Sequence, residues 1–157
     1  MRALKCMLVM LIASAACVSV AAKPSDADVD RYKASAMSFV REEGYMPTLD
    51  SDGDISFKRE GNSYWVQVEA YEDGYYVTVM TLTGIEGSNL TKVRLAMDEA
   101  VRSIKFARQY TTTSEKSVVT SYSWYCTSIA DFKKMFSDAL LVVSTADSRF
   151  IEKMVAE

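Results

Sequence analysis

Three aspartates in a short turn are the first residues whose spacing suggests chemistry. Asp50, Asp52 and Asp54 alternate with small residues, as in the first half of a calcium-binding loop. An EF-hand loop that begins at Asp50 needs glycine at its sixth position and glutamate at its twelfth. This chain has Ile55 and Gly61 there. The spacing therefore predicts a polar turn that leads into a strand, rather than a calcium site.

Acid–base catalysis would need two carboxylates that face each other, and the glutamates give no such signal. Nothing in the spacing of Glu42, Glu43, Glu60 and Glu69 places two of them opposite one another, as glycoside chemistry requires. Serine, threonine and lysine are plentiful, but they form neither a G-x-S-x-G nor an S-x-x-K motif. We expect these side chains to be solvated.

Histidine is absent from the chain, which removes Ser-His and Cys-His nucleophile pairs and histidine metal sites. Of the three cysteines, Cys6 and Cys17 lie near the N-terminus and Cys126 lies in the body of the sequence. A reactive thiol needs a lowered pKa and a basic neighbour, and neither is evident for Cys126. We interpret Cys126 as a buried small apolar residue and expect no cofactor.

The first 22 residues have the order of a secretory signal peptide. Arg2 and Lys5 precede an uncharged apolar run at 6–17, and Val20-Ala21-Ala22 places small residues before a cleavage site. The apolar run is too short, and too rich in alanine and serine, for a membrane span of about 20 residues. We therefore expect residues 1–22 to be removed and the protein to be exported, to the periplasm or the extracellular space.

Cys17 offers a second interpretation of this leader. Lipoprotein signals also end in small residues before a cysteine that is then lipidated, and Ser14-Ala15-Ala16-Cys17 resembles that pattern. Such signals usually have leucine or a similar residue where Ser14 stands. Lipidation at Cys17 would tether the protein to a membrane instead of releasing it.

Removal of the leader leaves residues 23–157, which suit one domain with a sizeable core. This segment has 16 Lys+Arg and 21 Asp+Glu, a net charge of −5, because the leader holds two basic residues and no acidic ones. A mildly acidic chain without a basic stripe argues against nucleic acid as a partner, and also against an anionic membrane surface. Membrane attachment is expected only in the case of lipidation at Cys17.

Hydrophobic periodicity, capping residues and glycine turns predict an α+β fold of one domain. The expected order is α-β-β-β-α-β-β-α, with about five antiparallel strands covered on one face by helices. The expected elements are a helix at 26–43, strands at 55–59, 63–71 and 75–82, a helix from 88 or 89 to 104, strands at 106–113 and 117–126, and a helix from 128 that continues past Asp147 or restarts there.

Alternation along the two longest central strands predicts two different sheet faces. One face is apolar and is expected in the core: Tyr64, Val66, Val68, Val77 and Val79. The other carries Trp65, Gln67, Glu69, Tyr71, Tyr76, Thr78 and Met80. Trp, Tyr and Met are enriched where proteins meet, so Trp65, Tyr71, Tyr76 and Met80 are the candidate partner-binding residues. The alternative is a sheet with one solvent-exposed face, on which such side chains have no binding role.

The segment GYMPTLDSDGDISFKREGNSYWVQVEAY, residues 44–71, resembles the opening of bacterial proteins with a type III secretion chaperone-like fold. The bacterial sensory transduction regulator (YbjN-type) proteins are related to these. The matching pieces are Gly44-Tyr45 at a helix end, Pro47, Asp52-Gly53-Asp54-Ile55, Phe57-Lys58, Glu60-Gly61 and Tyr64-Trp65. This resemblance extends from Asp26 to about Val143 and concerns the fold more than the activity.

The resemblance implies a non-enzymatic binding module, because it offers no catalytic residues to carry over. Secretion chaperones of this fold commonly dimerise and hold partner segments, so an unidentified protein or a second copy of the chain is the expected partner. They are cytoplasmic, however, whereas this chain carries an export leader, and a shared fold does not fix a function. Two alternatives stay open: a small-ligand-binding envelope protein, and an envelope enzyme that uses carboxylates and a lysine.

Overall fold

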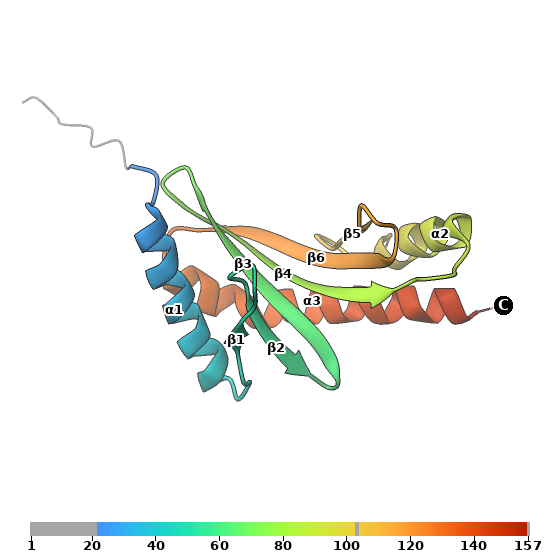
Figure 1. Ribbon diagram of the computed structural model, residues 1–157, viewed down its shortest axis with the longest axis horizontal. Helices are drawn as coiled ribbons and strands as arrows, with labels where there is room; N and C mark the ends of the chain where they lie inside the picture. The colour runs from blue at the N-terminus through green and yellow to red at the C-terminus, as the bar shows by residue number, and fades with distance from the viewer. Residues whose placement is uncertain (1–21, 103, 157) are drawn as a thin grey trace, which may run out of the picture.

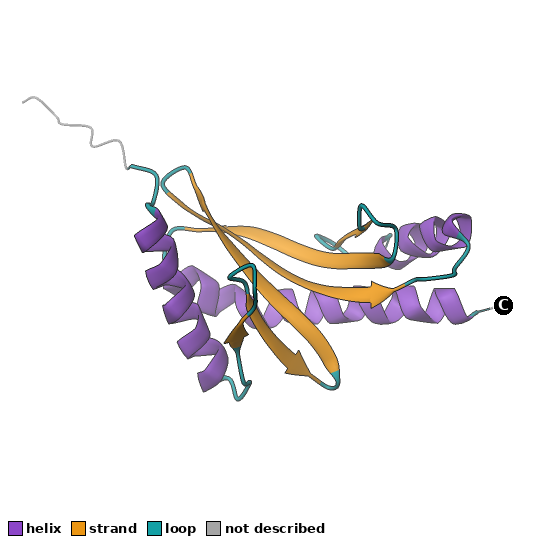
Figure 2. Ribbon diagram, viewed as in Figure 1, coloured by secondary structure: helices purple, strands orange, loops and turns teal. Residues whose placement is uncertain are grey.

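The computed structural model describes residues 22–102 and 104–156, so the expected leader lies outside the described residues except for Ala22. Within these ranges the chain forms three helices and six strands (Figures 1 and 2). The elements are α1 (Asp26–Glu42), β1 (Thr48–Leu49), β2 (Ile55–Arg59), β3 (Asn62–Tyr71), β4 (Gly74–Gly84), α2 (Leu90–Val101), β5 (Arg108–Thr111), β6 (Ser117–Cys126) and α3 (Ile129–Val155).

All six described strands join in one antiparallel sheet, in the order β1-β2-β3-β4-β6-β5. Short turns connect β2 to β3 and β3 to β4, which gives the expected meander. The longest pairing joins β4 to β6, from Tyr75 opposite Cys126 to Gly84 opposite Ser117. This pairing fixes which residues of β6 share a face with those of β4, because side chains alternate along a strand.

The three helices pack on the same face of this sheet, which confirms the predicted fold class. One core cluster joins Tyr32 of α1 and Phe132 of α3 to the inward residues of β2, β3 and β4. A second cluster joins Val93 of α2 to Val118 of β6 and Phe150 of α3. In Figure 1, α3 runs along the sheet with α1 near its N-terminal end and α2 near its C-terminal end.

Capping side chains define where α1 and α3 begin. Ser25 and Asp28 form a capping box at α1, and Ser128 and Asp131 form one at α3. The Asp131 carboxylate accepts hydrogen bonds from the backbone N–H groups of Thr127 and Ser128, both at 2.9 Å. These bonds, together with those from the Thr127 and Ser128 hydroxyls, hold the pKa of Asp131 below its ordinary value.

Aromatic rings fill the space between the sheet and the helices. Phe132 stacks on Trp124 of β6 with ring centroids 6.1 Å apart, and Phe136 lies 5.9 Å from Phe57 of β2. Both phenylalanines are buried, as are the predicted inward residues of β3 and β4. The predicted core face is therefore the buried one.

The structure differs from the prediction in its element boundaries and in one added strand. The sixth strand, β1, has only two residues, because Pro47 lacks an N–H group and ends the pairing before Thr48. β5 is shorter than predicted, since Phe106 adopts a left-handed backbone with φ 71°, which is incompatible with a strand. α2 ends at Val101 instead of 104, and α3 passes through Asp147 without a break.

Candidate protein-binding face

The sheet face opposite the helices is the candidate site, and we name it the open face. The register aligns its side chains in rows across the strands: Trp65 pairs with Met80, and Met80 pairs with Ser121. The open face is defined by the outward residues of β3, β4 and β6, which are Trp65, Gln67, Glu69, Tyr71, Tyr76, Thr78, Met80, Leu82, Val119, Ser121, Ser123 and Tyr125.

One half of the open face is apolar. Trp65 and Met80 lie side by side and are half-buried, and Leu82, the next outward residue of β4, is 42% exposed. Val119 and Ser121 of β6 are buried although the described helices pack on the other face. Neighbouring side chains on this side of the sheet therefore cover Val119 and Ser121, and Leu82 is the exposed apolar residue beside them.

The other half of the open face is a tyrosine cluster. The Tyr71 ring lies 6.0 Å from that of Tyr76 and 6.3 Å from that of Tyr125. All three rings are exposed, by 51%, 43% and 40% respectively. The Tyr125 hydroxyl donates a hydrogen bond to the Asp73 carboxylate, and this bond raises the pKa of Tyr125 to about 12. The cluster presents aromatic surface together with hydroxyl groups at its tips.

A polar row separates these two halves. Gln67, Thr78 and Ser123 lie opposite one another on β3, β4 and β6. The Thr78 and Ser123 hydroxyls are hydrogen-bonded at 2.8 Å, and Gln67 donates to the Asp54 carboxylate at 2.8 Å. These polar groups are satisfied within the chain, so the row can be covered by a partner without leaving them unpaired.

The structure places all four candidate residues on the open face, in two groups. Trp65 and Met80 belong to the apolar half, whereas Tyr71 and Tyr76 belong to the tyrosine cluster. Tyr125 and Leu82 also belong to this face, although the sequence did not lead us to predict them as binding residues. The signal for Tyr125 was present in β6, where Tyr122, Trp124 and Cys126 alternate on the inward side and leave Tyr125 on the outward side.

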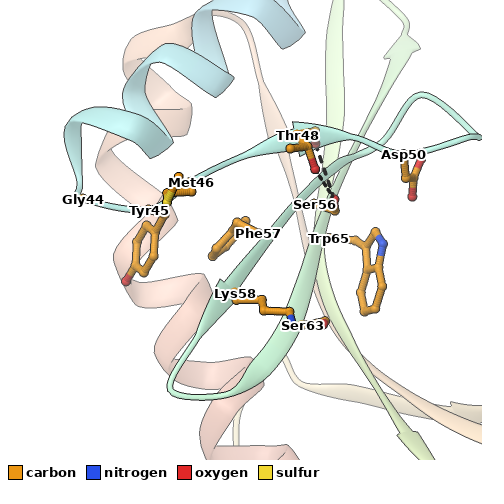
Figure 3. Close-up of a pocket in the computed structure, with 10 residues that line it drawn as sticks. All are labelled: Gly44, Tyr45, Met46, Thr48, Asp50, Ser56, Phe57, Lys58, Ser63 and Trp65. Atoms are coloured by element: carbon orange, nitrogen blue, oxygen red, sulfur yellow. Dashed lines mark hydrogen bonds between the residues drawn. The ribbon is translucent and has the colours of Figure 1, made fainter.

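A groove borders the apolar half at the β1–β2 edge of the sheet (Figure 3). It has a volume of about 630 Å³, and it is lined by residues that include Met46, Phe57, Lys58 and Trp65. Met46 is 88% exposed at its rim. β1 pairs with β2 only at Ile55 and Ser56, so the rest of the β2 edge is not continued by β1. A volume in this range suits a small molecule or a short extended peptide.

The four glutamates with a potential for acid–base chemistry lie in three separate places: the end of α1, the β2–β3 turn and the open face. Glu42 at the end of α1 is 3.7 Å from Lys133, and Glu60 in the β2–β3 turn is 3.7 Å from Arg59. Glu43 caps α1, and Glu69 lies on the open face. The structure does not bring these four carboxylates together in one site.

The three aspartates of the predicted polar turn form hydrogen bonds within the turn. The Asp50 carboxylate accepts bonds from the backbone N–H groups of Asp52 at 3.0 Å and Asp54 at 2.9 Å. Gly53 adopts the left-handed backbone that this tight turn requires, with φ 78°. Over residues 22–102 and 104–156, no group of three or more Asp, Glu, Cys or His side chains is arranged to hold a metal ion.

Cys126 and Asp147 are the buried titratable groups of chemical interest. Cys126 is fully buried, and burial raises the pKa of its thiol. Asp147 on α3 accepts a hydrogen bond from the Thr83 hydroxyl at 2.6 Å and a longer one from Thr120 at 3.4 Å. Burial raises the pKa of Asp147 despite these bonds. Both groups face the core, away from the open face.

Comparisons with known proteins do not identify the chain. No protein-family model, no curated protein and no solved structure matches it significantly. None of the described helices combines the length and the apolar character that crossing a membrane requires.

Proposed function

We propose that this protein is a non-enzymatic binding module that contacts another protein through its open face. One observation carries the proposal: exposed aromatic and apolar side chains from three adjacent strands gather on a sheet face opposite the described helices. Trp and Tyr anchor many protein interfaces, because they bury a large area at a small cost in side-chain entropy.

The resemblance of residues 44–71 to YbjN-type and secretion chaperone-like proteins supports this proposal, since it implies a binding module of the same kind. The mildly acidic chain supports a protein partner over nucleic acid. The polar row adds a further argument, because its hydrogen bonds are already made within the chain and covering it costs little.

The proposed site of action is outside the cytoplasm, on the evidence of the leader sequence alone. An intact mass of the exported protein tests this point. Cleavage after Ala22 predicts a product that starts at Lys23, and lipidation predicts one that starts at Cys17 with its lipid. A purified product that retains Met1 would contradict both interpretations of the leader.

Partner capture with matched variants tests the proposed function. The double variant W65S/M80S removes the apolar half of the open face, and it should reduce recovery of partner proteins from an envelope extract at least about tenfold. The control variants Leu95→Ser and Leu141→Ser remove exposed leucines of α2 and α3, which are 61% and 58% exposed. Quantitative mass spectrometry of the captured proteins gives the readout.

The expected result is loss of capture in W65S/M80S and full capture in both control variants. Circular dichroism melts should show that all the variants fold. Equal capture by W65S/M80S and the wild type would contradict the proposed function.

The groove at the β1–β2 edge supports a second candidate, a small-ligand-binding envelope protein. Its apolar wall suits an amphipathic molecule, and Lys58 can bind an anionic group at one part of a lining that also includes Asp50. Titration with 8-anilino-1-naphthalenesulfonate tests this, since Trp65 lines the groove and its fluorescence reports occupancy. Met46→Ser and Lys58→Ser should each weaken binding of the probe several-fold. An unchanged titration curve in both variants would rule out the groove as the binding site of the probe.

A further inference from the structure

We infer that the partner of the open face is a second copy of this chain, related by a two-fold axis. This inference rests on the proposed function, and it adds the identity of the partner. It follows from the way charge is divided along the open face.

The tyrosine end of the open face is acidic. Glu69 lies beside Tyr76 on the open face, and Glu72 and Asp73 form the adjoining β3–β4 turn. None of these three carboxylates takes part in an ion pair among the described residues. This end of the face therefore carries uncompensated negative charge.

The apolar end is flanked by basic residues on the outer strands. Lys58 of β2 pairs with Ser63, and Arg108 of β5 pairs with Ser121, so both side chains point to the outward face. Arg108 lies over the Tyr110 ring at 4.8 Å, and neither Arg108 nor Lys58 forms an ion pair with another described residue. The apolar end therefore carries positive charge that a partner can neutralise.

A two-fold axis brings these opposite ends together. The axis lies in the plane of the interface and runs along the polar row, perpendicular to the strands. It places the residue two positions before Thr78 in one copy over the residue two positions after Thr78 in the other copy. Tyr76 of one copy then lies over Met80 of the other. By the same operation Glu69 lies over Trp65, and Lys58 of that copy lies diagonally to it, one strand across and two residues along, within reach of its long side chain. Because the contact is isologous, each favourable pair occurs twice.

The size of the face suits such a dimer. β3, β4 and β6 have 10, 11 and 10 residues. At about 3.3 Å per residue and about 4.8 Å per strand, the five strands β2 to β6 present a face of roughly 20 by 30 Å. Specific interfaces bury about 600–1,000 Å² of accessible surface per partner, so a face with a planar area of roughly 600 Å² lies at the lower limit of that range.

Charge reversal gives the decisive experiment. In sedimentation velocity, the purified protein should have twice the monomer mass at micromolar concentration. Lys58→Glu and Glu69→Lys should each raise the dimer dissociation constant at least about tenfold, since each brings like charges near one another across the interface. The double variant K58E/E69K restores opposite charges across the interface, and its dissociation constant should return to within about threefold of wild type. Lys134→Glu, on the exposed side of α3, is the matched control and should leave the dimer unchanged.

The outcomes separate this inference from the proposed function. A monomer at all concentrations, with capture of another protein that still depends on Trp65, would overturn the two-fold dimer and leave the proposed function intact. A dimer that both single reversals leave unchanged would also overturn the inference, because its interface would lie elsewhere. Weakening by each single reversal and recovery in the double variant would establish it.

Discussion

The two faces of the sheet are built from the same strands and differ in how completely they are covered. On the helix side, Val66, Val77 and Val79 are fully buried. On the open face, their sequence neighbours include Trp65 and Tyr76, which remain partly exposed to solvent. The contrast shows that the helices cover one set of aliphatic and aromatic side chains completely, while Trp65 and Tyr76 lie on the face where none of the described helices packs.

The difference has an energetic meaning. A buried aliphatic or aromatic side chain contributes to folding through the apolar area that it removes from water, at about 25 cal/mol per Å². A side chain of the open face still exposes apolar area to water, and that area contributes free energy only when a partner covers it. Substitutions on the two faces should therefore affect different properties: stability on the helix side, and association on the open face.

Phe132→Ala should have the largest effect on stability, because it removes a ring from the centre of the helix side. The ring is fully buried and contacts the rings of Tyr32, Phe39, Trp124 and Phe136. Its removal leaves a cavity and should lower the free energy of unfolding by about 3–5 kcal/mol in urea titrations. A loss below about 1 kcal/mol would mean that the helix side is not a well-packed core.

Asp147→Asn should remove a pH dependence of stability that originates on the helix side. Burial raises the folded pKa of Asp147 above its ordinary value of 3.8, so the stability it contributes is full below pH 3.8 and is lost as pH rises through the raised pKa. Asparagine keeps the oxygen that accepts from Thr83 and does not ionise. Relative to this variant, the wild type should lose stability between acid and neutral pH in urea titrations. If the free energies of unfolding of the wild type and the variant change with pH in parallel, the raised pKa of Asp147 would be contradicted.

Trp65→Ala and Tyr76→Ala should change stability far less than Phe132→Ala and still weaken association. Both rings keep solvent contact, so we expect each variant to fold with a loss of no more than about 1 kcal/mol. Self-association or partner capture should fall several-fold in sedimentation and pull-down assays. Unchanged behaviour of both variants in both assays would remove the distinction between the two faces.

Tyr125→Phe should have the smallest effect. The hydroxyl is exposed, and its hydrogen bond to Asp73 is made in solvent, so stability should change by less than about 0.5 kcal/mol. The bond raises the pKa of Tyr125 to about 12, which a spectroscopic titration can detect. The wild type should show one more late-titrating tyrosine than the variant, and identical titration curves would show that the bond is not formed in solution.

Much of the fold could be predicted from sequence because the patterns were local. The caps at Ser25, Asn89 and Ser128 mark helix starts, and strict alternation in β3 and β4 separates the two faces. The two-residue strand β1 could not be predicted, since its pairing depends on contacts with β2 and not on a periodic pattern. The early end of α2 and the left-handed backbone of Phe106 likewise have no periodic signal in the sequence.

Of the candidate site, only the residues of the β3–β4 hairpin could be predicted from the sequence. Trp65, Tyr71, Tyr76 and Met80 all belong to β3 and β4, whose short turn fixes the register. Tyr125 and Arg108 come from strands that begin 24 or more residues after the end of β4, and the order β4-β6-β5 decides that they join the same face. The groove beside Trp65 depends on the path of the chain through Gly44, Tyr45 and Met46 before β1, which no spacing rule captures.

Hydroxyl-radical footprinting can show whether the open face is covered when partners are present. The protein is labelled twice, once purified and dilute and once at high concentration in envelope extract, and the modification of each aromatic ring is quantified by mass spectrometry. We predict that Trp65, Tyr71 and Tyr76 become protected in the extract, while Phe106, which is 77% exposed and lies away from the open face, stays reactive. Unchanged reactivity of all three open-face rings would contradict the assignment of this face as a binding surface.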